Sequence, residues 1–249
     1  MPARGWHHGR DRGGGACRGV SDRSAGRGRP CPVNGKDLSS PAGHRRNADL
    51  TRPDVADLLD RMMAHAALRG IRQVVNLHPD PRLTYTSRDL LADPAFATGL
   101  AALARRGLRF DLQLYPHQVR AAARLIEATP GLQVILNHAG MWADRTSAGW
   151  KAWKAALRDL AALPQVSVKI SGLGMFDPAW TAAGIRPLIL ETLEAFGTDR
   201  AMFASNFPVD KLFSDFPALW AAFAAAVADQ DAATRDALFC GNARRIYAI

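Results

Sequence analysis

Five short apolar runs recur along the chain, and they constrain the fold more than any other feature. They occupy residues 71–77, 109–115, 132–138, 166–172 and 201–207. Each run is continuous in apolar residues rather than strictly alternating, as expected of parallel strands that are buried on both faces. Amphipathic helical segments lie between the runs. This alternation predicts a parallel sheet with helices outside it, either a doubly wound sheet or a (β/α)8 barrel.

The helical segments are identified by apolar residues that recur every three or four positions. The first begins near Val55 and predicts a helix of about 15 residues that stops at Gly70. A later segment places Trp153 and Leu157 on the side that is expected to pack against the sheet. Asp215 precedes another helical segment, where a helix cap is a better interpretation than a catalytic acid. No GxGxxG or GxxxxGKS/T pattern follows a strand, so a nucleotide-binding sheet loses support.

The first 50 residues differ from the rest in composition. They contain ten of the 21 glycines, and their ten Lys and Arg against four Asp account for +6 of the net charge of +9. With so few apolar residues, such a segment buries too little surface to offset chain entropy. We therefore predict a disordered Arg/Gly-rich leader over residues 1–46 and a barrel domain over 47–249. A non-native leader, from a misplaced start or a shifted reading frame, is the favoured interpretation.

The composition of the chain bears on two kinds of partner, nucleic acid and membranes. The basic leader could bind nucleic acid, but it lacks the interleaved aromatic residues that stack on bases. Membrane partners are not expected, because the chain has no apolar stretch of about 18 residues and no apolar segment behind its first arginines. A cytoplasmic location is expected. The odd number of cysteines, without CxxC spacing, favours ordinary thiols over a zinc ribbon or a disulfide framework.

Polar residues gather where the predicted strands end, which is the edge that carries the active site in either parallel architecture. His138 is the strongest candidate, because the small Ala139 and Gly140 that follow it let a ligand approach closely. The competing interpretation of each such histidine is a hydrogen-bonded structural residue. Lys169 ends a buried strand, where a cation needs a protein partner or a substrate anion. The other candidates are His78, Asp80, His117, Gln118, Ser171, Asn206 and Asp210.

A family resemblance rests on six runs in order: GIRQVVNLHPD, FDLQLYPHQV, VILNHAGMW, VSVKISGLGMF, FGTDRAMFASNFPVDKL and GNARRIY. Residues 47–249 resemble the amidohydrolase-related family of TIM-barrel hydrolases, which includes lactonases that act on sugar lactones and pyrone carboxylates. The resemblance implies that the five strands are the last five of eight, with the N-terminal strands missing. It also implies that His138 matches a metal or substrate histidine. Asn242 would match an Asn near the terminal helix, interpreted here as a helix cap.

Two departures from the family pattern bear on the chemistry. The HxH metal-ligand pair that opens the family's first strand is absent. Asn206 stands where many members have an Asp, and an amide cannot take a proton from water. Asp210 is the nearest carboxylate, so we expect it to have a binding or base role.

Together these features predict a hydrolase that opens a small cyclic ester (a lactone) or related carboxylate by water attack on a carbonyl. The predicted catalytic residues are His138, Asp210 and Asn206, with His138 also the expected ligand of a divalent metal, zinc, whose binding would be weak or absent. The predicted substrate-binding residues are Arg72, His78, His117 and Lys169, and we expect Lys169, Arg72 or His78 to hold a substrate carboxylate. The alternative is a non-catalytic barrel remnant, whose open sheet edges would favour a homo-oligomer.

Overall fold

The computed structural model describes the backbone of residues 44–249 and the side chains from residue 47 onward. These residues belong to one compact unit. The predicted leader, up to residue 43, lies outside the described residues, so the expectation of disorder there stays a prediction.

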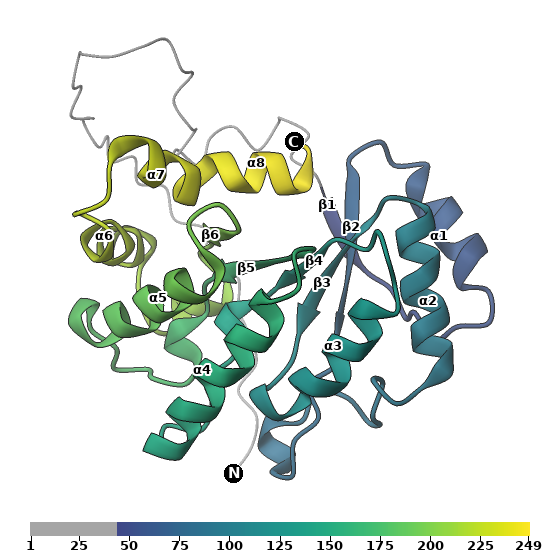
Figure 1. The fold of residues 1–249 in the computed structure, drawn as a ribbon, viewed down its shortest axis with the longest axis horizontal. Coiled ribbons are helices and arrows are strands. Elements are labelled where there is room, and N and C mark those ends of the chain that lie inside the picture. The colour runs from purple at the N-terminus through teal and green to yellow at the C-terminus, as the bar shows by residue number, and fades with distance from the viewer. Residues whose placement is uncertain (1–43) are drawn as a thin grey trace, which may run out of the picture. The chain divides into compact units, whose positions relative to one another are not determined.

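A single parallel sheet organises the described residues, with strands in the order β1-β2-β3-β4-β5-β6 (Figure 1). All five predicted runs contain strands, which are β2 to β6. The strands are β1 (His44–Asn47), β2 (Leu68–Val74), β3 (Arg109–Gln113), β4 (Val134–Leu136), β5 (Val166–Ile170) and β6 (Ala201–Phe203).

The sixth strand, β1, was not predicted from the sequence. It begins at residue 44, inside the segment assigned to the leader, and pairs in parallel with β2. Its sequence, HRRN, has no apolar residue. It is held by backbone hydrogen bonds to β2, and apolar patterning cannot detect such a strand.

Helices follow the strands as the alternation predicted, and those between consecutive strands form the outer layer seen in Figure 1. The lead-in helix is shorter than predicted, at 9 residues. The helices are α1 (Val55–Met63), α2 (Pro94–Arg105), α3 (Val119–Glu127), α4 (Ser147–Ala161), α5 (Ala182–Phe196), α6 (Phe216–Ala226), α7 (Ala232–Asp236) and α8 (Asn242–Tyr247).

Gly70 does not stop the first helix but lies within β2. A Cβ at this position would stand 2.6 Å from the carbonyl oxygen of Arg109 on β3. Real side chains do not tolerate such an approach, so the glycine is explained by close packing of two strand backbones.

The two faces of the sheet differ in polarity, which the continuous apolar runs did not predict. On β3, Phe110 and Leu112 join the apolar core under the helices, whereas Asp111 and Gln113 are buried on the opposite face. The same alternation recurs on β5, where Lys169 faces away from the apolar core. Successive side chains of a strand point to opposite faces. The inner face is therefore buried yet largely polar, and it carries the candidate chemistry.

The C-terminal helix α8 lies beside the starts of the first strands (Figure 1). The Arg109 guanidinium donates to the Ile246 carbonyl over 2.9 Å. Asn242 donates to the carbonyls of Thr198 and Ala201 over 2.6 and 2.8 Å. Asn242 is thus not the predicted helix cap but a buried side chain that hydrogen-bonds α8 to the start of β6.

Two further expectations can be compared with the structure. Asp215 caps α6 as predicted, since its carboxylate accepts from the Ala218 amide over 2.7 Å. Cys240 is disulfide-bonded, which corrects the expectation that all three cysteines are ordinary thiols.

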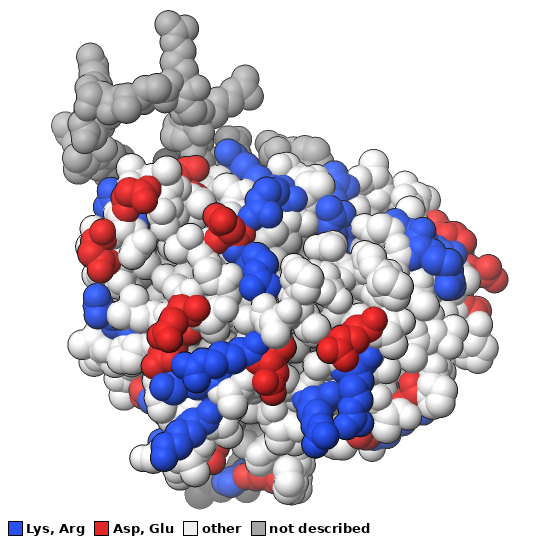
Figure 2. Space-filling model, viewed as in Figure 1, with Lys and Arg blue, Asp and Glu red and all other residues white. Residues whose placement is uncertain are grey.

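Two surface properties bear on possible partners, and both concern the described residues alone. Among residues 44–249, no helix combines the length and apolarity needed to cross a bilayer. On the face drawn in Figure 2, Lys and Arg are interspersed with Asp and Glu. This mixed face gives no support to a nucleic-acid interface there.

We expect Leu157→Ala to destabilise the fold strongly. Leu157 is 1% exposed on the side of α4 that faces the sheet, so its truncation should lower the free energy of unfolding by about 2–5 kcal/mol. Urea denaturation measures this. The matched control is Arg158→Ala on the same helix, with its side chain 58% exposed, for which a change within about 0.5 kcal/mol is expected. Equal losses in both variants would contradict the packing described here.

Candidate active site

The turn after β4 has an unusual backbone. His138, Ala139 and Met141 have φ angles of 55°, 47° and 52°, and Gly140 between them has 73°. Left-handed conformations are costly for residues with a Cβ and persist only where the surroundings hold them, often at functional sites. One such restraint comes from the buried Trp153, whose indole N–H donates to the Ala139 carbonyl over 2.6 Å. Trp153 therefore packs α4 on the sheet, as predicted, and also fixes this turn.

The His138 ring lies among polar groups from three strands. Its Nδ1 is 2.9 Å from the Ser171 hydroxyl, and its Nε2 is 3.2 Å from a guanidinium nitrogen of Arg72. Arg72 also donates to the side-chain carbonyl of Gln113. Because a guanidinium only donates, Nε2 accepts, and in the neutral ring Nδ1 carries the proton toward Ser171. The structure thus brings together two predicted site residues, Arg72 and His138.

Gly172, next to Ser171, brings the end of β5 close to the histidine. Its φ is +65°, and a Cβ there would stand 2.7 Å from Nδ1 of His138. Any side chain would displace the imidazole, so glycine is required at this position. The same Gly172 backbone hydrogen-bonds Asp210. Gly172 therefore connects the His138 group to the turn after β6.

Asn206 and Asp210 form the second group of predicted site residues. The Asn206 amide donates to Oδ1 of Asp210 over 2.8 Å, and the Asp210 side chain is buried, 3% exposed. Burial raises the pKa of the Asp210 carboxyl above its ordinary value, while the hydrogen bonds from Asn206 and Gly172 oppose that rise. Asn206 itself has φ of 55°. A buried carboxyl with a raised pKa is suited to proton transfer.

Lys169, predicted to hold a substrate carboxylate, has buried protein partners. Its ammonium donates to Oδ2 of Asp111 over 2.6 Å and to Oδ1 of Asn137 over 3.2 Å. Asp111 also accepts from the Tyr247 hydroxyl of α8 over 2.6 Å. Both members of the ion pair are buried. Lys169 and Asp111 therefore form a structural pair, because a buried ammonium needs a counter-charge within the fold. The expected contact of Lys169 with a substrate carboxylate stays a prediction.

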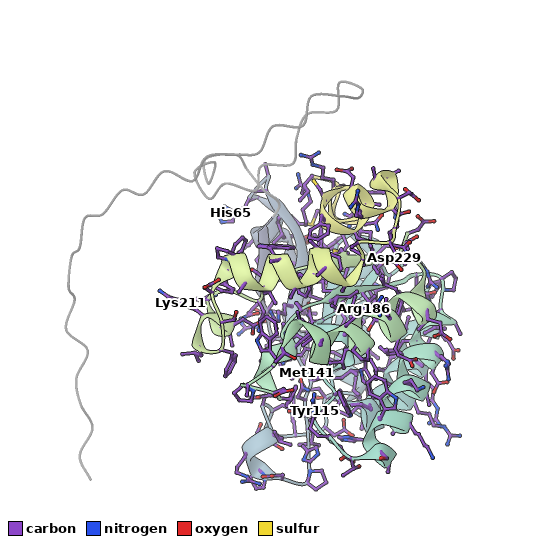
Figure 3. All side chains as sticks on the ribbon, turned by 90° about the vertical axis from the view of Figure 1, so that its left-hand side faces the viewer. His65, Tyr115, Met141, Arg186, Lys211 and Asp229 are labelled. Carbon is purple, nitrogen blue, oxygen red and sulfur yellow. The ribbon has the colours of Figure 1, made fainter. Side chains whose placement is uncertain are left out.

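His78 and His117 lie next to each other and form a group separate from the polar residues that contact His138. Their ring centroids are 5.6 Å apart, and Tyr115 stacks on His117 at 6.0 Å. Burial raises the pKa of the Tyr115 phenol, which donates to the Leu83 carbonyl over 2.8 Å. These rings border a cavity of about 180 Å³. Tyr115 lies toward the same end of the molecule as Met141 of the strained turn (Figure 3).

Two other strand-end candidates have structural roles. Gln118 is buried, accepting from the Tyr115 amide over 3.1 Å and donating to the Val75 carbonyl over 2.7 Å. Asp80 pairs with the exposed Arg82, whose guanidinium lowers the pKa of that carboxyl to about 2. Neither arrangement points to catalysis.

The residues around His138 do not form a ligand set for zinc. Among residues 44–249, no group of three or more His, Cys, Asp or Glu could hold a metal ion, whereas a catalytic zinc needs about three protein ligands. Both His138 nitrogens have polar neighbours, and one of these is the Arg72 cation. A positive guanidinium beside the ring nitrogen opposes binding of a second cation there.

Three residues of this region were not singled out from the sequence: Asp111, Asn137 and Tyr247. A signal existed for Asp111, because an acid within an otherwise apolar strand needs a buried partner. Asn137 directly precedes His138, and its buried Nδ2 has no hydrogen-bond partner among the described residues. Tyr247 carried no local signal, since it reaches Asp111 across 136 positions of sequence.

Comparison with known sequences gives a consistent group of relatives. A family model described as amidohydrolase matches residues 35–249. Uncharacterized protein y4mH of Sinorhizobium fredii is 47% identical over 203 residues, covering 81% of this chain and 68% of the relative. An L-fucono-1,5-lactonase of Burkholderia multivorans is 31% identical over 215 residues, covering 81% and 69%.

Solved structures confirm the predicted α/β barrel fold. An amidohydrolase of Burkholderia multivorans with bound zinc has a TM-score of 0.74 at 28% identity, covering 86% of this chain and 75% of that one. An amidohydrolase crystal structure from the same species with bound HEPES has a TM-score of 0.71 at 30% identity, covering 81% and 72%. A putative 2-pyrone-4,6-dicarboxylic acid hydrolase of Pseudomonas putida, at 22% identity and a TM-score of 0.60 over 83% and 70%, shares the fold.

Zinc titrated into the full chain is expected to bind weakly, because His138 is the one predicted ligand and Arg72 lies 3.2 Å from its Nε2. Isothermal titration calorimetry measures the affinity, with His138→Asn as the matched control. A tight, stoichiometric site would contradict this expectation. Its loss in variants of His78 or His117 would then identify the ligands.

The buried ion pair should show strong coupling. Lys169→Met and Asp111→Leu each leave an uncompensated buried charge and should each cost about 3–5 kcal/mol of unfolding free energy. The double variant leaves no such charge, so its loss should be clearly smaller than the sum of the two single losses. Urea denaturation of all four proteins completes the cycle. Additive losses would argue against a direct interaction.

Proposed function

Because the chain belongs to the amidohydrolase family, whose model matches residues 35–249, we propose that it hydrolyses a small cyclic ester (a lactone) or a related carboxylate by attack of water on the carbonyl carbon. The family and the 31% identical L-fucono-1,5-lactonase support a hydrolase. The lactone is the narrower part of the proposal.

The observation that carries the proposal is the buried Asp210 carboxyl beside the His138 group. Its pKa is raised by burial, and its neighbour Gly172 packs against the His138 ring. In the proposed reaction the Asp210 carboxylate takes a proton from water while the water oxygen attacks the carbonyl carbon. The ring C–O bond then breaks, and the leaving oxygen takes up the proton.

The surrounding donors have complementary roles. Arg72 supplies a cation that would stabilise negative charge developing on the carbonyl oxygen. Asn137 offers a buried amide donor with no partner among the described residues, and substrate would satisfy it. Asn206 cannot act as a base, but its bond to Asp210 orients the carboxylate.

No step of this scheme passes through a metal ion. The family and its zinc-bound structural neighbour suggest a metal, but the described donors around His138 do not fit one. A lactone is a reactive ester, so a carboxylate base with cationic polarisers is sufficient for the chemistry proposed.

Asp210→Asn and His138→Asn should each lower hydrolysis of L-fucono-1,5-lactone by about 10²-fold or more, because they remove the base and disrupt its partner group. Melting temperatures should change by only a few degrees, since a loss of 1 kcal/mol lowers Tm by about 2–4 °C in a chain of this size. The control Asp159→Asn makes the same charge change on the exposed face of α4. Unchanged hydrolysis in both site variants would leave the fold assignment but remove the site assignment.

The acid limb of the rate profile should follow Asp210. The base must be ionised, so the rate should rise with pH through the raised pKa of its carboxyl. Fold stability should change with pH in the opposite direction to the rate. Because folding raises the pKa of this carboxyl, the protonated group stabilises the fold below the ordinary pKa of 3.8, and this stabilisation is lost as pH rises through the folded-state pKa. Asp210→Asn should therefore flatten the pH dependence of stability between these values.

A further inference from the structure

A second cavity lies beside the His138 group. Loops after β2, β3 and β4 enclose about 180 Å³, and the lining residues include His78, Tyr115, His117, Trp142 and Asp144. Trp142 also lines a small cavity at His138 and Gly172. Because Trp142 lines both cavities, the larger one lies next to the proposed reaction site. Its volume suits one small ring rather than a larger ligand.

The hydrogen bonds of His78 fix its tautomer. Its Nδ1 accepts from the Asp80 amide over 2.9 Å. A ring nitrogen that accepts from an N–H carries no proton, so the proton of this neutral imidazole is on Nε2. Among the described residues nothing hydrogen-bonds that Nε2, and His78 therefore has a donor for a ligand.

His117 has the opposite arrangement. Its Nε2 lies 2.9 Å from the Leu77 carbonyl, which can only accept, so Nε2 is the donor. In the neutral ring Nδ1 is then an acceptor, and no described residue hydrogen-bonds it. The two facing histidines thus offer one donor and one acceptor, with ring centroids 5.6 Å apart.

The charge of the cavity is negative. The Thr146 amide donates to Asp144 over 3.0 Å, and hydrogen bonds from Thr146 lower the pKa of that carboxyl, so Asp144 is ionised near neutral pH. Within the described part of the chain, the residues lining the cavity include neither Lys nor Arg. The nearby Arg145 guanidinium stacks on Trp142, 4.0 Å from its ring centroid, but it donates to the Asp177 carboxylate over 3.0 Å, so its charge is already paired. A ligand carboxylate in the cavity would therefore meet the Asp144 anion.

We propose that this cavity binds the hydroxylated side of an uncharged ring and selects against rings that carry a carboxylate. A hydroxyl both accepts and donates, so it satisfies His78 and His117 together, whereas a carboxylate can only accept. Tyr115 and Trp142 supply aromatic walls, and the buried Trp142 indole N–H has no partner among residues 44–249. The inference rests on the proposed function in assigning the ring to the substrate. It replaces the prediction that His78 holds a substrate carboxylate.

Binding of stable ring pairs tests the proposal without turnover. The probes are the methyl α-pyranosides of D-glucose, D-galactose and D-mannose, each paired with its uronate, which differs by one carboxylate. Saturation-transfer NMR and calorimetry with the full chain measure the affinities at pH 7.5. The best neutral ring is expected to bind at least about 10-fold more tightly than its uronate, or about 1.4 kcal/mol. Equal or tighter binding of the uronate, or binding of no neutral ring, would overturn the proposal.

Variants locate the binding. His117→Phe keeps a ring against Tyr115 but removes the acceptor, and should weaken the neutral ring at least about 5-fold. The control is His65→Phe, at an exposed histidine toward the opposite end of the molecule (Figure 3), and should change nothing. Asp144→Asn, at an exposed loop residue, should lower the ratio of neutral-ring affinity to uronate affinity. This variant tests the proposal even if His117→Phe folds poorly. An unchanged preference in Asp144→Asn would refute the electrostatic part of the proposal.

Hydrolysis assays keep this proposal separate from the proposed function. Binding of the neutral ring with no hydrolysis of any 1,5-lactone would support the cavity and refute the hydrolase. Hydrolysis of a 1,5-lactone together with preferential uronate binding would do the reverse.

Discussion

The buried ion pair of Lys169 and Asp111 is the interaction on which the inner face of the sheet depends. It joins β5 to β3, and through Tyr247 and Asn137 it extends to the C-terminal helix and to the residue before His138. Two charges removed from water are tolerable only when they are paired and hydrogen-bonded. Because these groups pair and hydrogen-bond with one another inside the fold, the inner face can be polar and still buried.

A second constraint connects this scaffold to the site. The turn after β4 is held in left-handed conformations, with the buried Trp153 indole bonded to one of its carbonyls. Gly172 lets β5 approach the His138 ring and also bonds Asp210. The packing of Trp153, the left-handed turn and the absence of a side chain at Gly172 together place the His138 imidazole near the buried Asp210 carboxyl. Acid-base chemistry requires such preorganisation.

Electrostatics divide the strand ends into two regions. Around His138 the dominant charge is the Arg72 cation, which suits a developing oxyanion and opposes a metal ion. In the neighbouring cavity the lining carries the Asp144 carboxylate and two imidazoles of opposite hydrogen-bonding character. A ring whose carbonyl is in the first region and whose hydroxyls are in the second would match both, which is consistent with the lactonase among the relatives.

The sequence by itself determined β2 to β6, the Asp215 cap and the strand-end positions of His138, Asn206 and Asp210, because apolar periodicity and helix caps are local properties of a chain. Periodicity left a doubly wound sheet and a barrel open, and the family resemblance indicated the barrel. The sequence did not identify β1, whose polar residues are held by backbone pairing alone. Only the tertiary structure decided that Lys169 meets Asp111, 58 positions away, and which nitrogens of His78 and His117 carry protons. Partners and tautomers depend on groups that folding brings together, and no local pattern encodes them.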